Sequence, residues 1–131
     1  MNIESHLTTS ARHASHFLSS GPESGMPIIF VHGWPELSIS WRHQLPYFAE
    51  RGFRTVAPDM RGYGESDIYK HHADYAQREV VADMLELADA LAIERAIWVG
   101  HDWGCATVWQ MARHHPDRCL AICHTVAHPQ S

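Results

Sequence analysis

One carboxylate stands between two glycines in the second half of the chain, in the sequence Gly-His-Asp-Trp-Gly at residues 100–104. The apolar run 96–99 precedes this sequence, and a helical pattern follows it. Small residues two positions before and after a central side chain are typical of a nucleophile elbow, a tight strand-to-helix turn that exposes the central side chain. We therefore predict that Asp102 is a nucleophile. The alternative is that Asp102 is an ordinary N-cap of the helix.

A nucleophilic carboxylate restricts the chemistry of the substrate. By attacking a saturated carbon atom it becomes an alkyl ester, so the substrate must carry an electrophilic carbon and a leaving group, as epoxides and alkyl halides do. Water must then add to the ester carbonyl, and backbone N–H groups would stabilise the oxyanion that develops there. The N-terminus of a helix that begins at Trp103 would also favour the anionic form of Asp102.

Strand-like runs alternate with helical patterns along the chain. Residues 1–25 are expected to hold one or two edge strands, a strand buried on both faces is expected at 27–31, and further strands are expected at 53–58, 96–99 and 119–126. This alternation predicts an α/β fold, with a mostly parallel sheet flanked by helices.

Three amphipathic segments are expected to form helices between these strands. The first spans about 41–52 and is kinked or restarted at Pro46. The second begins at Asp74, with Gln77 three residues later as in a capping box. The third follows the glycine-flanked aspartate and spans about 103–114.

Ligands of parallel sheets bind beyond the carboxyl ends of the strands. Three loops are expected at that edge, at residues 32–36, 59–67 and 100–104. Their expected convergence favours Asp102 as a nucleophile over Asp102 as a helix cap.

The same three loops resemble motifs of the α/β-hydrolase-fold epoxide hydrolases: His-Gly-Trp-Pro at 32–35, Asp-x-Arg-Gly-Tyr-Gly-x-Ser-Asp at 59–67, and Gly-His-Asp-Trp-Gly at 100–104. The resemblance covers the βαβ core, 26–131, of a single domain, 1–131, and corresponds to the N-terminal part of that fold without its lid domain and C-terminal strands. It implies hydrolysis of a small-molecule epoxide to a vicinal diol through a covalent ester, with no cofactor.

The resemblance also implies roles for the motif residues. The backbone N–H groups of Trp34 and Trp103 would form the oxyanion hole, Pro35 would follow a cis peptide bond, and these three residues would border the substrate pocket. The other motif residues would shape the loops near the site: His32, Gly33, Asp59, Arg61, Gly62, Gly64, Gly100, His101 and Gly104. We interpret Asp59 and Arg61 as a buried ion pair that shapes the glycine loop rather than as catalytic groups.

Two alternatives to an epoxide hydrolase stay open. Haloalkane dehalogenases use the same ester chemistry and share Asp-Trp at the turn, where the Trp103 indole would bind a halide. They typically have Asn at the position of Trp34, however, and their second glycine loop differs. An epoxide leaves as an alkoxide that needs a general acid, which the resemblance places on tyrosines of the lid. The second alternative is a non-catalytic chain that serves as a binding or assembly partner.

A hydrolytic triad in this fold needs an acid and a late histidine after the nucleophile. After Asp102 the only acid is Asp117, no tyrosine follows Tyr75, and the histidines lie on the predicted helix or on the next strand and its end: His114, His115, His124 and His128. We therefore expect this chain to be the N-terminal half of an enzyme and unable to turn over the ester alone. Its last strand would be an open edge prone to self-association.

Composition argues against several other classes of protein. A net charge of -5 gives no electrostatic reason to expect nucleic acid or an anionic membrane as a partner. No apolar run reaches membrane-spanning length, no secretory signal is visible, and three cysteines do not make a disulfide framework, so a cytoplasmic protein is expected. Histidines and cysteines cluster at 114–128, but both cysteines there lie in an apolar run, so we expect no metal site.

Overall fold

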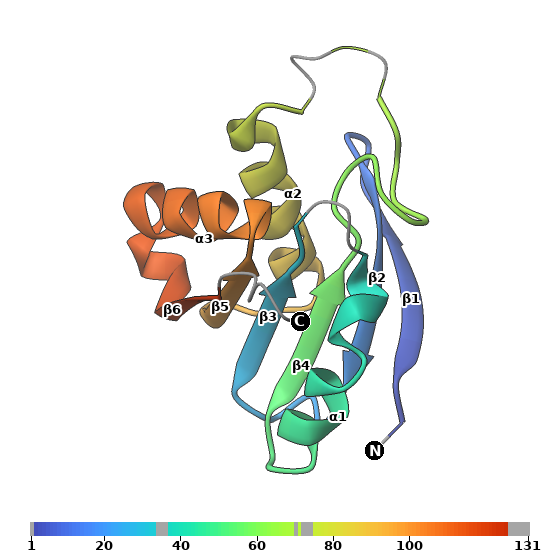
Figure 1. Ribbon diagram of the computed structural model, residues 1–131, viewed down its shortest axis with the longest axis vertical. Coiled ribbons are helices and arrows are strands. Elements are labelled where there is room, and N and C mark those ends of the chain that lie inside the picture. The colour runs from blue at the N-terminus through green and yellow to red at the C-terminus, as the bar shows by residue number, and fades with distance from the viewer. Residues whose placement is uncertain (1, 34–36, 70, 72–74, 126–131) are drawn as a thin grey trace, which may run out of the picture.

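Six strands form one mixed sheet in the computed structural model, which describes residues 2–33, 37–69, 71 and 75–125. The strands follow the spatial order β1-β2-β4-β3-β5-β6 (Figure 1). β2 is antiparallel to β1 and β4, whereas β4, β3, β5 and β6 run parallel to one another. The strands are β1 (Glu4–Thr9), β2 (Ala14–Ser20), β3 (Pro27–Val31), β4 (Arg54–Pro58), β5 (Ala96–His101) and β6 (Cys119–Thr125). The predicted α/β fold is confirmed, and a strand lies in each predicted range, but β2 pairs with both β1 and β4 and is therefore an interior strand rather than an edge strand.

The helices within the described ranges are α1 (Gln44–Ala49), α2 (Gln77–Ala90) and α3 (Trp103–His114), with 3-10 turns η1 (Ser38–Trp41) and η3 (Pro116–Arg118). The first predicted helix is therefore divided between η1 and α1. Pro46 lies in the first turn of α1, where its missing N–H removes no intrahelical hydrogen bond. None of the helices in these ranges is both long and apolar enough to cross a bilayer.

The predicted start of α2 is wrong. Ala76 is the N-cap of α2, and no side chain caps the helix. Gln77 is thus the first helical residue rather than the third, and its side-chain oxygen instead accepts a hydrogen bond from the Thr107 hydroxyl of α3, 3.0 Å away. The predicted cap, Asp74, lies outside the described residues. The bond between Gln77 and Thr107 joins the beginning of α2 to α3.

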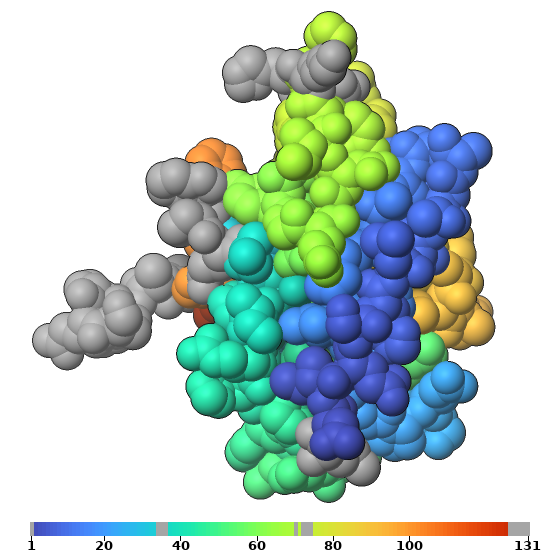
Figure 2. Space-filling view, turned by 90° about the vertical axis from the view of Figure 1, so that its right-hand side faces the viewer, coloured from blue at the N-terminus to red at the C-terminus, as the bar shows by residue number. Residues whose placement is uncertain are grey.

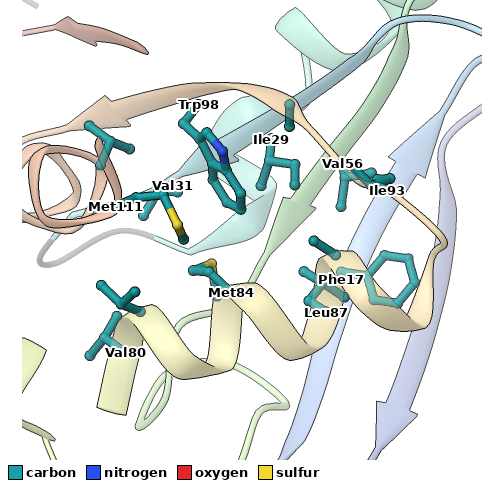
Figure 3. Packing of buried hydrophobic residues seen from close by; sticks show 14 of the residues in the cluster. Phe17, Ile29, Val31, Val56, Val80, Met84, Leu87, Ile93, Trp98 and Met111 are labelled. Atoms are coloured by element: carbon teal, nitrogen blue, oxygen red, sulfur yellow. The ribbon is translucent and has the colours of Figure 1, made fainter. Parts of the chain in front are cut away.

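Alternating side chains of the central strands divide the core between the two faces of the sheet. Ile29 and Val31 of β3 belong to the cluster formed with α2 and α3, whereas Ile28 and Phe30 pack with η1 and α1. Figure 3 shows the larger cluster, in which Met84 of α2 points toward the sheet. Two helices therefore cover one face and α1 covers the other, which leaves the loops at the carboxyl ends of the parallel strands to form a site.

Met84 tests the contribution of the larger cluster to stability. Its side chain is fully buried, so Met84→Ala removes apolar contacts and leaves a cavity. We expect the variant to lose about 2–5 kcal/mol of unfolding free energy in a urea titration. Ile68→Ala is the control, because Ile68 is 75% exposed. Equal losses in both variants would contradict the assigned core.

β6 forms one edge of the sheet and is mostly exposed. Its sequence CLAICHT contains no Asp, Glu, Lys or Arg, the residues that usually protect an edge strand from pairing with another chain. Leu120 is 47% exposed on this strand. Self-association through this edge stays a prediction.

A charge on β6 should reduce that self-association. We expect the weight-average mass of the parent chain to rise with concentration in sedimentation equilibrium, and Leu120→Lys to suppress the rise. Leu7→Lys is the matched control, since Leu7 is 61% exposed on β1 at the opposite edge. A parent chain that stays monomeric at all concentrations would refute the prediction.

Candidate active site

The turn from β5 to α3 holds Asp102 in an unusual backbone conformation, with φ +56° and ψ −119°. The flanking glycines let the backbone pack closely around it. A Cβ atom at Gly100 would lie 2.5 Å from the carbonyl oxygen of Gly104, and one at Gly104 would lie 2.2 Å from the carbonyl oxygen of Val31. The Asp102 side chain is exposed and makes no capping hydrogen bond to α3. Asp102 is thus the N-cap residue of α3 by position, but its side chain does not make the capping hydrogen bond of an ordinary N-cap.

The loop after β3 lies directly against this turn. A Cβ atom at Gly33 would lie 2.6 Å from the Cβ of Asp102 and 2.9 Å from the backbone nitrogen of Trp103. Trp103 is the first residue of α3, so its N–H has no carbonyl partner within the helix. Two of the three predicted loops therefore meet at Asp102. Trp34 and Pro35, together with the predicted second oxyanion donor and cis peptide bond, lie outside the described residues.

His32 joins the loop after β3 to the loop after β4. Its Nε2 accepts a hydrogen bond from the backbone N–H of Met60 at 2.9 Å, so its Nδ1 carries the proton and faces the carbonyl oxygen of Gly33 at 3.0 Å. At the end of β5, Nδ1 of His101 lies 2.7 Å from the Thr125 hydroxyl at the end of β6. The His32 bonds thus connect two of the loops, and the His101 contact joins the ends of two neighbouring strands.

The predicted ion pair between Asp59 and Arg61 is wrong. Asp59 instead accepts hydrogen bonds from the backbone N–H of Ser38 at 2.8 Å and from Nδ1 of His16 at 2.6 Å. Burial alone would raise the pKa of Asp59, but the bonds from Ser38, His16 and the N–H of Glu65 together lower the pKa below its ordinary value. Asp59 therefore stays ionised and connects β2, η1 and the glycine loop.

Arg61 pairs with a carboxylate that the sequence analysis did not single out. Its Nε and Nη2 lie 2.6 and 2.7 Å from the two oxygens of Asp83, which is almost fully buried. Arg12 binds the same carboxylate, and His13 Nε2 lies 3.6 Å from it. A signal for this cluster was present, since Asp83 falls on the apolar face of α2 beside Met84. A carboxylate at such a position needs a buried partner.

Hydrogen bonds connect the glycine loop, residues 59–67, to β2. Its Ser66 hydroxyl accepts from the N–H of His16, and Asp67 exchanges hydrogen bonds with the backbone of Ala14. Figure 2 shows this part of the chain in yellow-green, packed beside the blue N-terminal strands. Gly62 and Gly64 both have positive φ, and a Cβ at Gly64 would collide with the Asp59 carboxylate. The conformation of the loop therefore depends on glycine at these two positions.

A pocket of about 180 Å³ opens beside the turn that holds Asp102. Gly33 and Trp103, which border Asp102 on two sides, both line it. Its walls also include His32 after β3, Tyr63 of the glycine loop, Val80 of α2 and Thr107 of α3. The pocket lies where the three predicted loops converge.

The lowered pKa values of two buried groups, His13 and Asp59, predict that acid destabilises the fold. Burial, opposed in part by Asp83, lowers the pKa of His13 below its ordinary value near 6.5. Below about pH 6.5, His13 therefore takes up a proton more readily in the unfolded chain than in the folded chain, so the free energy of unfolding decreases as the pH falls. The lowered pKa of Asp59 adds a second loss, which begins as the pH falls below about 4.

His13→Gln should remove the first of these losses. We expect the unfolding free energy of the parent to decline between pH 7 and pH 5, and the variant to decline less over that range. His43→Gln is the control, because His43 is exposed. Unfolding at fixed urea concentrations, followed by tryptophan fluorescence, measures the slope. Identical slopes for the parent and His13→Gln would contradict this assignment.

Comparison with known proteins agrees with this architecture. A family model described as the alpha/beta hydrolase fold matches residues 26–131. The chain is 45% identical over 101 residues to epoxide hydrolase A of Mycobacterium tuberculosis, covering 76% of this chain and 31% of that protein. It is 40% identical over 113 residues to epoxide hydrolase 2 of Siraitia grosvenorii, covering 86% and 35%. It thus spans about a third of the length of these curated relatives.

Solved structures show the same relationship. Epoxide hydrolase A of Mycobacterium thermoresistibile superposes with a TM-score of 0.90 at 32% identity, covering 94% of this chain and 39% of that one. An epoxide hydrolase of Vigna radiata superposes with a TM-score of 0.88 at 31% identity, covering 98% and 43%. The sheet order, the strand-to-helix turn and the family match lead to one conclusion: the chain belongs to the α/β-hydrolase fold family.

Proposed function

We propose that this chain carries the nucleophile of an epoxide hydrolase and that Asp102 is that nucleophile. The observation that carries the proposal is the exposed Asp102 carboxylate at a strained turn, beside the N-terminus of α3 and the loop at Gly33. The similarity to proteins named epoxide hydrolases supports the substrate class.

The proposed reaction has two steps. One carboxylate oxygen of Asp102 attacks a ring carbon of the epoxide, the bond from that carbon to the ring oxygen breaks, and the resulting alkoxide takes a proton from an acid. Water then adds to the ester carbonyl, and the vicinal diol leaves with the Asp102 carboxylate restored. The backbone N–H of Trp103 is one donor for the oxyanion of this second step. The other proposed donor, Trp34, lies outside the described residues.

A halide is the alternative leaving group, since the Trp103 side chain beside Asp102 is 67% exposed and its indole N–H is a hydrogen-bond donor. Haloalkane dehalogenation would use the same ester on Asp102. The named relatives favour the epoxide. Parallel incubations with an epoxide and a bromoalkane separate the two reactions.

The ester is expected to persist on the 131-residue chain. Hydrolysis needs a base beside the ester carbonyl, and the ring nitrogens of His32 are engaged by Met60 and Gly33. His101, next to the nucleophile, holds the Thr125 hydroxyl. We propose that these two histidines serve in those contacts rather than as the base that activates water, and that the chain therefore accumulates the covalent intermediate.

Intact-protein mass spectrometry tests the proposal. After incubation with styrene oxide we expect the parent to gain one substrate mass, and Asp102→Asn to lose at least 100-fold of this labelling rate, because an amide is a poor nucleophile. Asp89→Asn is the control for an exposed carboxylate elsewhere. Circular dichroism verifies that each variant folds.

Epoxides also alkylate thiols, and the chain has free cysteines at Cys105, Cys119 and Cys123. The expected adduct is an ester, which hydroxylamine cleaves, whereas a thioether resists hydroxylamine. Peptide mapping should place the labile adduct on Asp102. A folded parent chain with no hydroxylamine-labile adduct would refute the proposal and would favour a non-catalytic binding or assembly role.

A further inference from the structure

Ser5, His16 and Asp59 are joined by hydrogen bonds near the β1 edge of the sheet, away from the strand that carries Asp102. The Ser5 hydroxyl lies 2.6 Å from Nε2 of His16, and Nδ1 of His16 lies 2.6 Å from Oδ2 of Asp59. Ser5 belongs to β1, His16 belongs to β2, and Asp59 follows β4 directly. Strand pairing therefore brings a serine, a histidine and a carboxylate together in the order of a hydrolytic triad.

The Asp59 carboxylate determines which nitrogen of the His16 ring carries a proton. Asp59 is ionised and can only accept hydrogen bonds, so Nδ1 of the neutral ring carries the proton and donates it. Nε2 then has a free lone pair, and the Ser5 hydroxyl donates to it. In this arrangement His16 can take the hydroxyl proton as the serine oxygen attacks an electrophile, and Asp59 stabilises the imidazolium that forms.

The three groups differ in exposure as a reactive serine requires. The side chains of Asp59 and His16 are 4% and 11% exposed, whereas Ser5 is exposed on the edge strand β1. Figure 2 shows the N-terminal strands in blue at the surface of the molecule. A substrate can therefore reach the serine oxygen while His16 and Asp59 are held inside the fold.

A second carboxylate competes with Ser5 for the His16 ring. Oε2 of Glu65 lies 3.1 Å from the same Nε2, and the Glu65 side chain is 76% exposed. A carboxylate at that distance attracts the protonated ring, which cannot accept the proton of Ser5. Because Glu65 is so exposed, Glu65→Gln tests the role of the ring without disturbing the core.

Apolar side chains lie around the Ser5 hydroxyl. Leu18 of β2 is the cross-strand partner of Ser5, and Ile3 packs against the cluster that contains Leu18. Leu7 follows Ser5 by two positions on β1, so it points to the same face of the sheet, and it is 61% exposed. These neighbours favour an apolar acyl group over a charged one.

We propose that Ser5 is a second nucleophile of this chain, activated by His16 and positioned through Asp59, and that it accepts apolar acyl groups from activated carboxylic esters. The described contacts supply a nucleophile and its base but assign no oxyanion donors, so the expected substrates are activated esters, whose leaving groups depart readily, rather than amides.

The proposed reaction follows from these contacts. Oγ of Ser5 attacks the carbonyl carbon of the ester, and the hydroxyl proton passes to Nε2 of His16. The bond to the leaving alcohol breaks, and that alcohol takes the proton from His16. Water then releases the carboxylic acid from Ser5 by the same route. The reaction does not depend on the proposed ester chemistry of Asp102.

An alkyl phosphonofluoridate tests the nucleophile, because an activated serine attacks its phosphorus, displaces fluoride and forms a stable adduct. All labelling is done on Asp102→Asn chains, so that Asp102 contributes nothing to it. We expect one adduct, which peptide mapping places on Ser5, and Ser5→Ala should abolish it. Ser24→Ala is the control for an exposed serine and should keep full labelling. A folded chain without an adduct on Ser5 would overturn the proposal and leave the function proposed for Asp102 untouched.

The pH dependence of labelling tests the base. The charged groups in contact with the His16 ring are Asp59 and Glu65. Labelling should increase from pH 6 to pH 8.5, because only an unprotonated Nε2 accepts the serine proton, and Glu65→Gln should raise the rate at pH 6. His16→Gln should lower the rate at pH 8 about 100-fold, the usual contribution of a general base. Should His16→Gln fail to fold, the pH profiles of the parent and of Glu65→Gln decide, and profiles that are flat in both would overturn the role of His16.

Two p-nitrophenyl esters test the substrate class. Release of p-nitrophenolate from the butyrate and from the acetate is compared, each rate divided by that ester's rate with free imidazole. We expect a preference for the butyrate that disappears in Leu7→Ser, and Ser5→Ala should lose the reaction with both esters. Equal relative rates in the parent would overturn the preference for apolar acyl groups.

Discussion

The site depends on three backbone contacts that leave no room for a side chain. Gly100 packs against Gly104, Gly104 against the end of β3, and Gly33 against Asp102. A Cβ atom at any of these glycines would come within 2.6 Å of a neighbouring atom. The chain can therefore reverse from β5 into α3 only by forcing Asp102 to a positive φ, which costs on the order of 1–3 kcal/mol. Its neighbours must hold that conformation in place.

The position of β5 in the sheet explains how the turn is held. β5 pairs with β3 on one side and β6 on the other, and Trp98 near its middle is buried in the core. The Trp98 indole also donates to the carbonyl oxygen of Arg118, just before β6. On the far side of the turn, Val108 and Met111 of α3 lie in the same core. Strand pairing and helix packing thus fix both ends of a turn that is unfavourable by itself.

The apolar runs and the glycine pattern were enough to predict the strands and the position of Asp102, because both are local features. The partners of the buried charges were not predictable in this way. Asp59 and Arg61 are two residues apart, which suggested a pair, yet their partners lie 43 and 22 positions away, at His16 and Asp83. Asp59 meets His16 because β2 pairs with β4, and Arg61 meets Asp83 because α2 packs beside the loop. Spacing along the chain does not reveal such contacts.

The beginning of α2 shows the same competition between local and distant bonds. The sequence allows Gln77 to take part in a capping box, but its side chain bonds to Thr107 of α3 instead. Because α2 begins at Gln77 itself, this side chain is not at the third helical position that a capping box requires, and it bonds to α3 instead. That bond forms part of the pocket wall. The proposed nucleophile is therefore set by a local turn and is visible in the sequence, whereas the shape of the pocket beside it depends on contacts that only the folded chain creates.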